Sequence, residues 1–412
     1  MIAKNLVFHA STGEDNNSFV GIKIIGNHIN FFYPESYHFD ENNYSRDDIL
    51  DLLKTISIAK STSQDNSDTY NSRKNDSELA FFSYVWMIEN YLVNGLYKDT
   101  EKIYKTNQKG RVNWKRTLQQ QPIISSGNVI YKDLIVEVTD PYESIMIEIH
   151  KYCLKKCFTL LGWIYGIDAS FIEITPNLEQ RKSEFLDAIR REKDLCFNDE
   201  KHTLLSHMEN VLIGLDEVAD DKSIIYGVDS YHYVFERMID RIFGTEKAED
   251  YYPTFTWHLK YSDKQSGMSG PTIRPDTIMK DSDTGDIYII DSKFYRFGSL
   301  DISQTRGLPE AGSIVKQITY GSYVKSENPE SNIYNAFIMP FDSQGENAKK
   351  IDKENQSIIY TGYVESDWES EKTYSKVFTF LVDMKYVVKT WNRLNHIRDQ
   401  KTIIDVIRQN ED

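Results

Sequence analysis

The chain has 412 residues, of which 40% are hydrophobic, 27% charged and 13% aromatic. This composition is typical of a globular protein and excludes a mostly disordered chain, and the length suits two or three domains. The net charge of −15 argues against a protein coated in basic surface. It does not exclude nucleic acid as a partner, because a local basic groove is enough for binding.

The chain has three cysteines, Cys153, Cys157 and Cys196. A disulfide framework would need more cysteines and an even number of them. The first two lie one helical turn apart in an apolar stretch, so we expect them to pack in a core. No apolar run reaches the roughly 18 residues of a membrane span, and the N-terminus lacks the pattern of a signal peptide. We therefore expect a soluble, cytoplasmic protein that makes no membrane contact.

The first part of the chain predicts strands, then helices joined by a polar segment. Residues 19–34 alternate apolar and polar side chains around a Gly-Asn pair, which is typical of a β-hairpin. Residues 47–60 have helical spacing, and residues 78–97 predict a buried helix. Between them, residues 61–77 are rich in Ser, Asn and Asp and predict a loop or linker.

Residues 102–116 form the most basic stretch of the chain and contain no acidic residue. Aromatic side chains are interleaved with the cations, which suits stacking on bases beside phosphate contacts. Docking on a protein partner is a second interpretation, and a solvated basic loop is a third. The candidate DNA- or partner-binding residues are Lys105, Lys109, Arg111, Trp114, Lys115 and Arg116.

The remainder of the chain predicts alternating helices and strands. In order, they are a strand at 128–138, a long helix at 144–166, two or three helices up to residue 244, a helix at 314–326, strands at 332–341 and 357–366, and a terminal helix at 374–393. This alternation predicts a mixed α/β or α+β fold.

The stretch PTIRPDTIMKDSDTGDIYIIDSKFYRF, residues 271–297, places two acids and a lysine on one predicted hairpin. If the segment DSDTGD forms the turn, Asp276 stands directly opposite Asp291, with the Cβ atoms roughly 5 Å apart. Lys293 shares a strand face with Asp291, because side chains alternate with a period of two. The hairpin thus gathers three charged groups at one end.

Opposed carboxylates repel each other and destabilise a sheet unless something compensates their charge. Mg²⁺, which prefers oxygen ligands, is the natural candidate, and we expect Mn²⁺ to substitute for it. Lys293 would orient or activate a water molecule and stabilise negative charge on a phosphate. The alternative is a solvent-exposed acidic hairpin in which this spacing arises by chance.

The arrangement resembles the PD-(D/E)xK nuclease superfamily, in which two acids bind Mg²⁺ and a lysine assists attack on the phosphodiester. The resemblance makes Asp276 and Asp291 the metal-binding acids and Lys293 the catalytic lysine. Such nucleases often carry a further acid on a preceding helix. Glu236, in YHYVFERMIDRIFG, is the candidate for this catalytic and metal-binding position.

Many relatives in this superfamily also carry a glutamine and a tyrosine on the helix that follows the hairpin. Gln317 is the candidate glutamine, and Tyr320 and Tyr323 compete for the place of the tyrosine. Arg274 and Lys316 are candidates for contacts with backbone phosphate, with ordinary surface charge as the alternative.

The chain as a whole is similar to LlaJI-type restriction endonucleases and, more distantly, to the McrC subunits of McrBC restriction systems. The similarity lies in the segments GIKIIGNHINFFYP, GRVNWKRT and VFERM and in the hairpin above. It implies a Mg²⁺-dependent nuclease subunit that cuts double-stranded DNA in defence against phage, together with a McrB-like AAA+ GTPase. Residues 1–166, a β-rich and helical adaptor region, would dock on this motor. Residues 167–412 would form the PD-(D/E)xK nuclease domain, which could dimerise.

The chain contains no G-x-x-x-x-G-K-[ST] motif, so nucleotide hydrolysis would fall to the partner. Three alternatives stay open. A self-sufficient dimeric type II restriction endonuclease would find its own DNA site. A non-catalytic adaptor would use the nuclease fold as a scaffold for a motor partner, and a repair or recombination nuclease would share the same chemistry.

Overall fold

In the computed structural model, the described residues are 6–13, 18–25, 28–61, 76–97, 102–107, 109, 111–125, 128–139, 145–174, 178–219, 224–261, 268–270, 272–300, 302–345, 348, 357–368 and 372–411. The predicted linker at 61–77 lies almost entirely outside these residues. None of the described helices is long and apolar enough to cross a bilayer.

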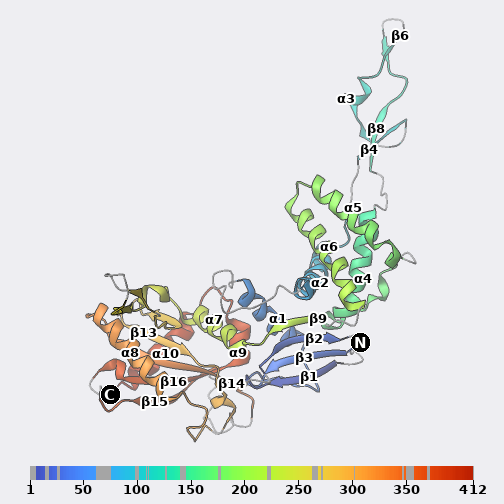
Figure 1. The fold of residues 1–412 in the computed structure, drawn as a ribbon. Coiled ribbons are helices and arrows are strands. Elements are labelled where there is room, and N and C mark those ends of the chain that lie inside the picture. Colours follow the sequence, from blue (N-terminus) through green and yellow to red (C-terminus); the bar gives the residue numbers. More distant parts are fainter. Residues whose placement is uncertain are drawn as a thin grey trace. The chain divides into compact units, whose positions relative to one another are not determined.

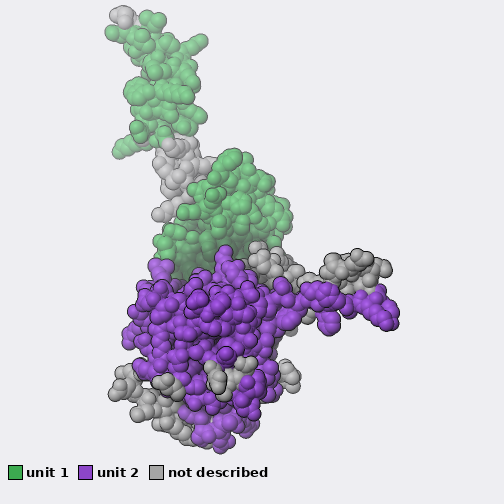
Figure 2. Space-filling model, turned by 90° about the vertical axis from the view of Figure 1, so that its left-hand side faces the viewer, with its two compact units in different colours: residues 1–4, 25–27, 73–225 green, residues 5–24, 28–72, 226–412 purple. Residues whose placement is uncertain are grey.

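The chain divides into two compact units, drawn in green and purple in Figure 2. Unit 1 consists of residues 1–4, 25–27 and 73–225, and unit 2 of residues 5–24, 28–72 and 226–412. This division differs from a boundary at residue 166, because the N-terminal strands belong with the C-terminal part of the chain. As a division of functions, the domains 1–166 and 167–412 stay a prediction.

Unit 1 contains a group of long helices. They are α2 (Asp76–Asn94), α4 (Ile145–Tyr165), α5 (Lys182–Leu195) and α6 (Asp199–Ala219), with the short 3-10 turns η2 (Ala169–Phe171) and η3 (Leu178–Arg181). The helices predicted at 78–97 and 144–166 are confirmed as α2 and α4. Cys153 and Cys157 are fully buried on α4 and unpaired, as expected for core residues.

A small β-module completes unit 1. Its three-stranded sheet has the order β4-β8-β5, and it also contains a helical turn and a two-stranded hairpin. The elements are β4 (Lys102–Thr106), β5 (Arg111–Val112), α3 (Trp114–Thr117), β6 (Ile123–Ser125), β7 (Asn128–Ile130) and β8 (Ile135–Thr139). Within the module, the β6–β7 hairpin lies at the end away from β4 and β8 (Figure 1).

The prediction of one strand over residues 128–138 is wrong, because the segment bends between β7 and β8. The side chain of Asn107 holds the bend. Its amide donates to Asp133 Oδ1 at 2.7 Å, and its carbonyl oxygen accepts from the Leu134 backbone N–H at 2.8 Å. The turn chemistry of a residue distant in sequence therefore overrides the local strand pattern.

The described part of unit 2 contains two large sheets, besides the two-stranded pair of β10 (Thr256–Trp257) and β11 (Met268–Ser269). The first has the order β1-β3-β2-β9 and consists of β1 (Leu6–Ser11), β2 (Val20–Ile25), β3 (His28–Pro34) and β9 (Ile224–Val228). Strands β2 and β3 are neighbours, as the hairpin pattern predicts. Gly21 and Gly227 let β2 and β9 approach closely, since a Cβ at Gly21 would stand 2.2 Å from the Tyr226 carbonyl oxygen.

The second sheet is mixed and has the order β12-β13-β14-β16-β15. Its strands are β12 (Thr277–Lys280), β13 (Ile287–Ser292), β14 (Ile333–Phe341), β15 (Ile358–Glu365) and β16 (Lys376–Asp383). The middle strands β13, β14 and β16 run parallel, whereas β12 and β15 pair antiparallel at the two edges. Every residue of β13 and β14 is buried, as expected for parallel strands covered on both faces.

Helices and short elements surround these sheets. They are α1 (Arg46–Ser61), α7 (Tyr231–Phe243), η4 (Ala248–Tyr251), β10 (Thr256–Trp257), β11 (Met268–Ser269), η5 (Arg296–Ser299), α8 (Ala311–Glu327), η7 (Thr373–Ser375), α9 (Met384–Thr390) and α10 (Ile397–Gln409). The predicted α/β class, with helices and sheets mixed along the chain, is confirmed.

The terminal helix predicted at 374–393 is wrong in its first half, which forms strand β16. The segment KVFTFLVD is rich in β-branched and aromatic residues, and it pairs with β14 on one side and β15 on the other. The helix starts only at Met384, where the side chain of Asp383 accepts the Lys385 N–H at 3.0 Å.

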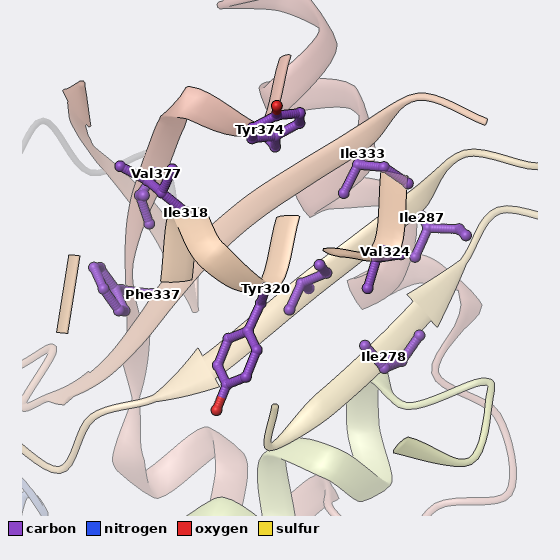
Figure 3. Packing of buried hydrophobic residues seen from close by; sticks show 10 residues of the cluster. Ile278, Ile287, Ile318, Tyr320, Val324, Ile333, Phe337, Tyr374 and Val377 are labelled. Carbon is purple, nitrogen blue, oxygen red and sulfur yellow. The ribbon is translucent and has the colours of Figure 1, made fainter. Parts of the chain in front are cut away.

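A hydrophobic cluster packs the predicted nuclease hairpin against α8 (Figure 3). It joins Ile278, Ile287 and Ile289 of the hairpin to Ile318, Tyr320 and Val324 of α8, and to Ile333, Phe337, Tyr374 and Val377. Figure 3 shows the Tyr320 hydroxyl pointing away from the aliphatic side chains of this cluster. The packing fixes the strands whose ends carry the charged residues.

Candidate active site

The charged residues of the hairpin lie at its open end, opposite the turn. The antiparallel register pairs Thr277 with Ile290, so continuing it by one residue places Asp276 across from Asp291. Asp276 Oδ2 also accepts the Ser292 backbone N–H at 2.9 Å. At the other end the Asp281 N–H donates to the Asp286 carbonyl oxygen at 2.9 Å, which closes the turn. The predicted opposition of the two aspartates is therefore confirmed.

Asp291 is almost completely buried, and its two carboxylate oxygens have different surroundings. Its Oδ2 lies 2.5 Å from the Lys293 ammonium nitrogen, whose side chain is 17% exposed. Its Oδ1 is buried and has no hydrogen-bond partner among the described residues. A buried acceptor without a donor is costly, so this oxygen is available to a cation.

Lys293 is held as a cation. Burial alone opposes the charged form of the amine, but the negative charges of Asp291 and Asp276 outweigh it and raise the pKa of Lys293 overall. Its backbone N–H donates to the Ile338 carbonyl oxygen at 2.9 Å, which anchors the residue to β14. The side chain is therefore suited to stabilise negative charge rather than to remove a proton.

Two further carboxyl groups, those of Glu236 and Asp276, interact electrostatically with Asp291. Burial, followed by the charges of Asp276 and Asp291, raises the pKa of Glu236 on α7 to about 8. Burial and the charge of Asp291 raise the pKa of Asp276 to about 7, against the opposing effects of the Ser292 N–H and Lys293. The structure thus brings Glu236 into electrostatic range of both aspartates, and the three acids hold more negative charge than their surroundings stabilise.

The donor set fits a Mg²⁺ ion. Among the described residues, no group of three or more His, Cys, Asp or Glu side chains is arranged to hold a metal ion by itself. Mg²⁺, however, is usually bound through one or two carboxylates with water completing its shell. Asp276 and Asp291 supply two carboxylates, one with an unpartnered oxygen, and a cation would relieve the repulsion that raises the neighbouring pKa values.

Helix α8 places its candidate residues in different surroundings. Gln317 is buried, and its amide donates to the Ile289 carbonyl oxygen at 2.8 Å and to Asn335 Oδ1 at 3.4 Å. Its donors therefore tie α8 to the sheet.

Burial and the charges of Asp291 and Asp276 raise the pKa of Tyr320, whereas the Tyr323 hydroxyl donates to the Tyr252 carbonyl oxygen at 3.4 Å. Tyr320 is thus the tyrosine within range of the acids.

Two basic residues lie near this group. The pKa values of Glu236 and Asp276 are raised overall, and the charge of Lys316 opposes this rise. Its ammonium is therefore within electrostatic range of the acids. The Lys316 nitrogen lies 5.4 Å from the centroid of the Tyr320 ring. The Arg274 guanidinium lies 5.8 Å from the centroid of the Tyr252 ring.

The basic stretch lies in the other unit, within the β-module. Its cations are mostly exposed, although Lys105 is half-buried, and Trp114 is 59% exposed. The Arg116 guanidinium stacks 3.7 Å from the centroid of the Tyr104 ring. The structure therefore gathers Glu236, Asp276, Asp291 and Lys293 in unit 2, and the candidate residues from Lys105 to Arg116 in unit 1.

A cavity of about 590 Å³ opens beside Glu236 and Lys293. Its walls come from residues 12, 13 and 18 and from the segments 229–236, 292–300 and 306–310, all within unit 2. The sequence alone does not predict this cavity, since no spacing or motif links the start of the chain to the segment that follows the hairpin. Only the folded arrangement of the two sheets brings these segments together.

A sequence profile described as LlaJI restriction endonuclease matches residues 19–385 of this chain. No curated protein matches it. A solved structure that it resembles is a refined half-complex from the tetradecameric assembly of Thermococcus gammatolerans McrB AAA+ hexamers with bound McrC. The sequence identity is 12% and the TM-score 0.36, over 94% of this chain and 83% of the other. A TM-score below 0.5 does not establish a shared fold.

Proposed function

The chain belongs to the LlaJI restriction endonuclease family and is an endonuclease, and from this premise we propose that it hydrolyses DNA phosphodiesters with Mg²⁺ at the hairpin site. Asp276 and Asp291 would hold the ion, and Glu236 would add its charge from α7. Lys293 would stabilise the phosphate. This assigns to the chain a PD-(D/E)xK nuclease centre, and Mn²⁺ is expected to replace Mg²⁺.

The observation that supports this proposal most directly is the buried surplus of negative charge. Three carboxyl groups lie within electrostatic range of one another, only Asp291 is paired with an ammonium, and the other two have pKa values raised to about 7 and 8. A purely structural site would gain stability by replacing such acids with apolar side chains. A site that binds a divalent cation needs them as they are.

The residues then have separate tasks in hydrolysis. Mg²⁺ bound by the two aspartates would supply the positive charge that activates a water molecule and balances the phosphate. The Lys293 ammonium stabilises the charge that develops on the phosphate oxygens. The water oxygen attacks in line as the phosphorus–oxygen bond to the leaving group breaks, without a covalent enzyme intermediate. Gln317 is a positioning residue, because its amide holds α8 against β13.

We also propose that a McrB-like AAA+ GTPase is the partner of this nuclease in phage defence. The sequence has no G-x-x-x-x-G-K-[ST] motif of its own, so nucleotide hydrolysis would fall to a second subunit. The β-module offers a surface for such a partner. Its basic stretch is followed by a hairpin whose apolar side chains Ile123, Ile124, Val129 and Ile130 are 49–76% exposed.

The test is plasmid cleavage by the full chain with Mg²⁺, alone and with the candidate motor subunit plus GTP, beside Asp291→Ala. Cleavage that needs the partner and is lost in Asp291→Ala supports the whole proposal. Cleavage by the chain alone favours the self-sufficient type II enzyme, whose nuclease domain would dimerise on double-stranded DNA. Undiminished cleavage by Asp291→Ala would refute the hairpin site.

A further inference from the structure

The cavity beside the hairpin contains groups that the hydrolytic mechanism does not use. Glu236 and Lys293 form part of its wall, so any molecule in the cavity adjoins the site where the scissile phosphate would be held. Its volume of about 590 Å³ is within the range of pockets for small molecules and is too small for a duplex. The cavity therefore suits one unit of a DNA strand.

One wall presents an exposed aromatic ring directly behind the lysine. The Tyr295 N–H donates to the Lys293 carbonyl oxygen at 2.8 Å, which turns the chain sharply after the strand. Phe294 also lines the cavity, but its ring packs against the protein, with its centroid 5.8 Å from that of Tyr231 and 5.5 Å from that of Phe235. Tyr295 lines the cavity and is 39% exposed, so its ring is available for stacking on a base.

The cations of the cavity differ in their partners. Lys293 is paired with Asp291, and Arg296 makes two hydrogen bonds with the Glu35 carboxylate at 2.8 and 3.0 Å. Arg306 is exposed and has no ion-pair partner among the residues that the structure describes. Of these three cations, it is the one whose charge is not already neutralised by a carboxylate.

The loop that carries Arg306 is held against the protein. Gly307 has a φ of 83°, and a Cβ there would stand 3.0 Å from the Phe297 backbone nitrogen. Glycine therefore lets the loop fold back onto η5, next to the strand end that carries the lysine. The wall also offers polar groups suited to the edge of a base, including Thr12, Ser18 and the carboxylate of Asp229.

We propose that this cavity binds the nucleotide next to the scissile phosphate. Its base stacks on Tyr295, and its outer phosphate is bound by Arg306. The inference rests on the proposed nuclease function and adds a binding site to it. Arg306 and Tyr295 act as positioning residues, because they bind the neighbouring nucleotide and not the reacting atoms.

The probe is thymidine 3′,5′-bisphosphate, one nucleotide with two phosphates, titrated into the full chain with Mg²⁺ in a calorimeter. We expect Arg306→Ala to weaken binding about tenfold or more, because a charge-assisted hydrogen bond is lost. Tyr295→Ala is expected to weaken it about tenfold, whereas Tyr295→Phe keeps the ring and the affinity. Arg398→Ala is the matched control, since Arg398 is exposed and does not line the cavity.

A second measurement, on the same preparations, is hydrolysis of thymidine 5′-(p-nitrophenyl phosphate), which lacks the outer phosphate. Arg398→Ala should leave its rate within about twofold of the unmodified protein, and Arg306→Lys should recover part of the bisphosphate affinity. If Arg306→Ala binds the bisphosphate as Arg398→Ala does, the nucleotide site is wrong. Loss of binding in Arg306→Ala, with no Mg²⁺-dependent plasmid cleavage by the unmodified protein together with its motor subunit and GTP, would support the site and refute the nuclease proposal.

Discussion

Two hairpins of this chain invert the usual distribution of side chains in opposite ways. The β12–β13 hairpin buries charge, since every residue of β13 is buried and Asp276 and Asp291 stand opposite each other at its end. The β6–β7 hairpin exposes apolar side chains instead, with Ile124 76% and Val129 60% exposed. Each arrangement costs free energy in the isolated chain, because charge is desolvated in one and apolar surface faces water in the other.

The difference indicates what each hairpin lacks. The buried acids lack a cation, and a small, highly charged ion is the ligand that relieves them. The exposed apolar residues lack a covering surface, and a protein partner is the ligand that covers such a patch. One chain therefore separates its chemistry, which needs rigid burial, from its proposed docking surface, which needs exposure.

The largest effect is expected from the buried hairpin. Asp291→Asn should lower the rate of Mg²⁺-dependent cleavage at least about a hundredfold, because a charged ligand and the partner of Lys293 are lost together. The measurement is single-turnover plasmid cleavage, with circular dichroism to show that the variant folds. Lys293→Ala should have a similar effect on cleavage.

The matched control for this prediction is Asp283→Asn. Asp283 lies in the exposed turn of the same hairpin, so it tests whether any loss of acid there is harmful. Cleavage by the control should stay within about twofold of the unmodified protein. Equal losses in Asp291→Asn and Asp283→Asn would mean that the buried acid has no special role.

The charge of the buried site should also make stability depend on pH in a specific direction. The folded state keeps the proton of Glu236 up to about pH 8, whereas the unfolded chain releases it near its ordinary pKa of 4.5. The stabilising contribution is therefore complete below about pH 4.5 and is lost as the pH rises through 8. Its size is on the order of a few kcal/mol.

The measurement is the unfolding temperature between pH 5 and pH 9 in EDTA, repeated with Mg²⁺. We expect a decline with rising pH that Mg²⁺ reduces, since the cation stabilises the charged carboxylates. Glu236→Gln removes one of the two groups with raised pKa values and should make the decline less steep. A slope that is the same in Glu236→Gln and in the unmodified protein would show that this carboxyl group is not strained by its neighbours.

The two hairpins also show how far sequence reasoning reaches. The register of β12–β13 is predictable, because the turn DSDTGD and the alternation of the flanking strands define one pairing. The position of Glu236 is predictable only through a resemblance, since nothing in its helix shows that it faces the aspartates. The cavity that contains Tyr295 and Arg306 is not predictable, because it forms where segments far apart in the chain meet.

The same limit explains two of the errors in secondary structure. The apolar run of β16 fits a helix as well as a strand when it is read alone, and pairing with β14 and β15 decides between them. The bend between β7 and β8 depends on Asn107, which precedes it by about 25 residues of chain. Tertiary contacts, absent from any local pattern, determine both outcomes.

A smaller effect is expected at the exposed hairpin. Ile124→Ser should leave stability within about 0.5 kcal/mol, because the side chain is already in water. It should lower cleavage in the presence of the motor subunit about tenfold, if the tip is buried in that complex. Leu394→Ser, which changes a fully exposed leucine of unit 2, is the control, and equal cleavage by both variants would exclude the tip as a docking surface.

The smallest effect is expected from a single cation of the basic stretch, and it separates the two roles that this stretch allows. If Lys115 contacts DNA phosphate, Lys115→Ala should weaken DNA binding and reduce the slope of log affinity against log salt concentration by about 1. The measurement is fluorescence anisotropy of a labelled duplex over a range of salt concentrations, with Lys372→Ala as a control at an exposed lysine of unit 2. If the slope is unchanged but assembly with the motor subunit weakens, the stretch belongs with the exposed hairpin to the partner surface. DNA would then be contacted by unit 2, where Arg274 and Lys316 lie near the buried acids.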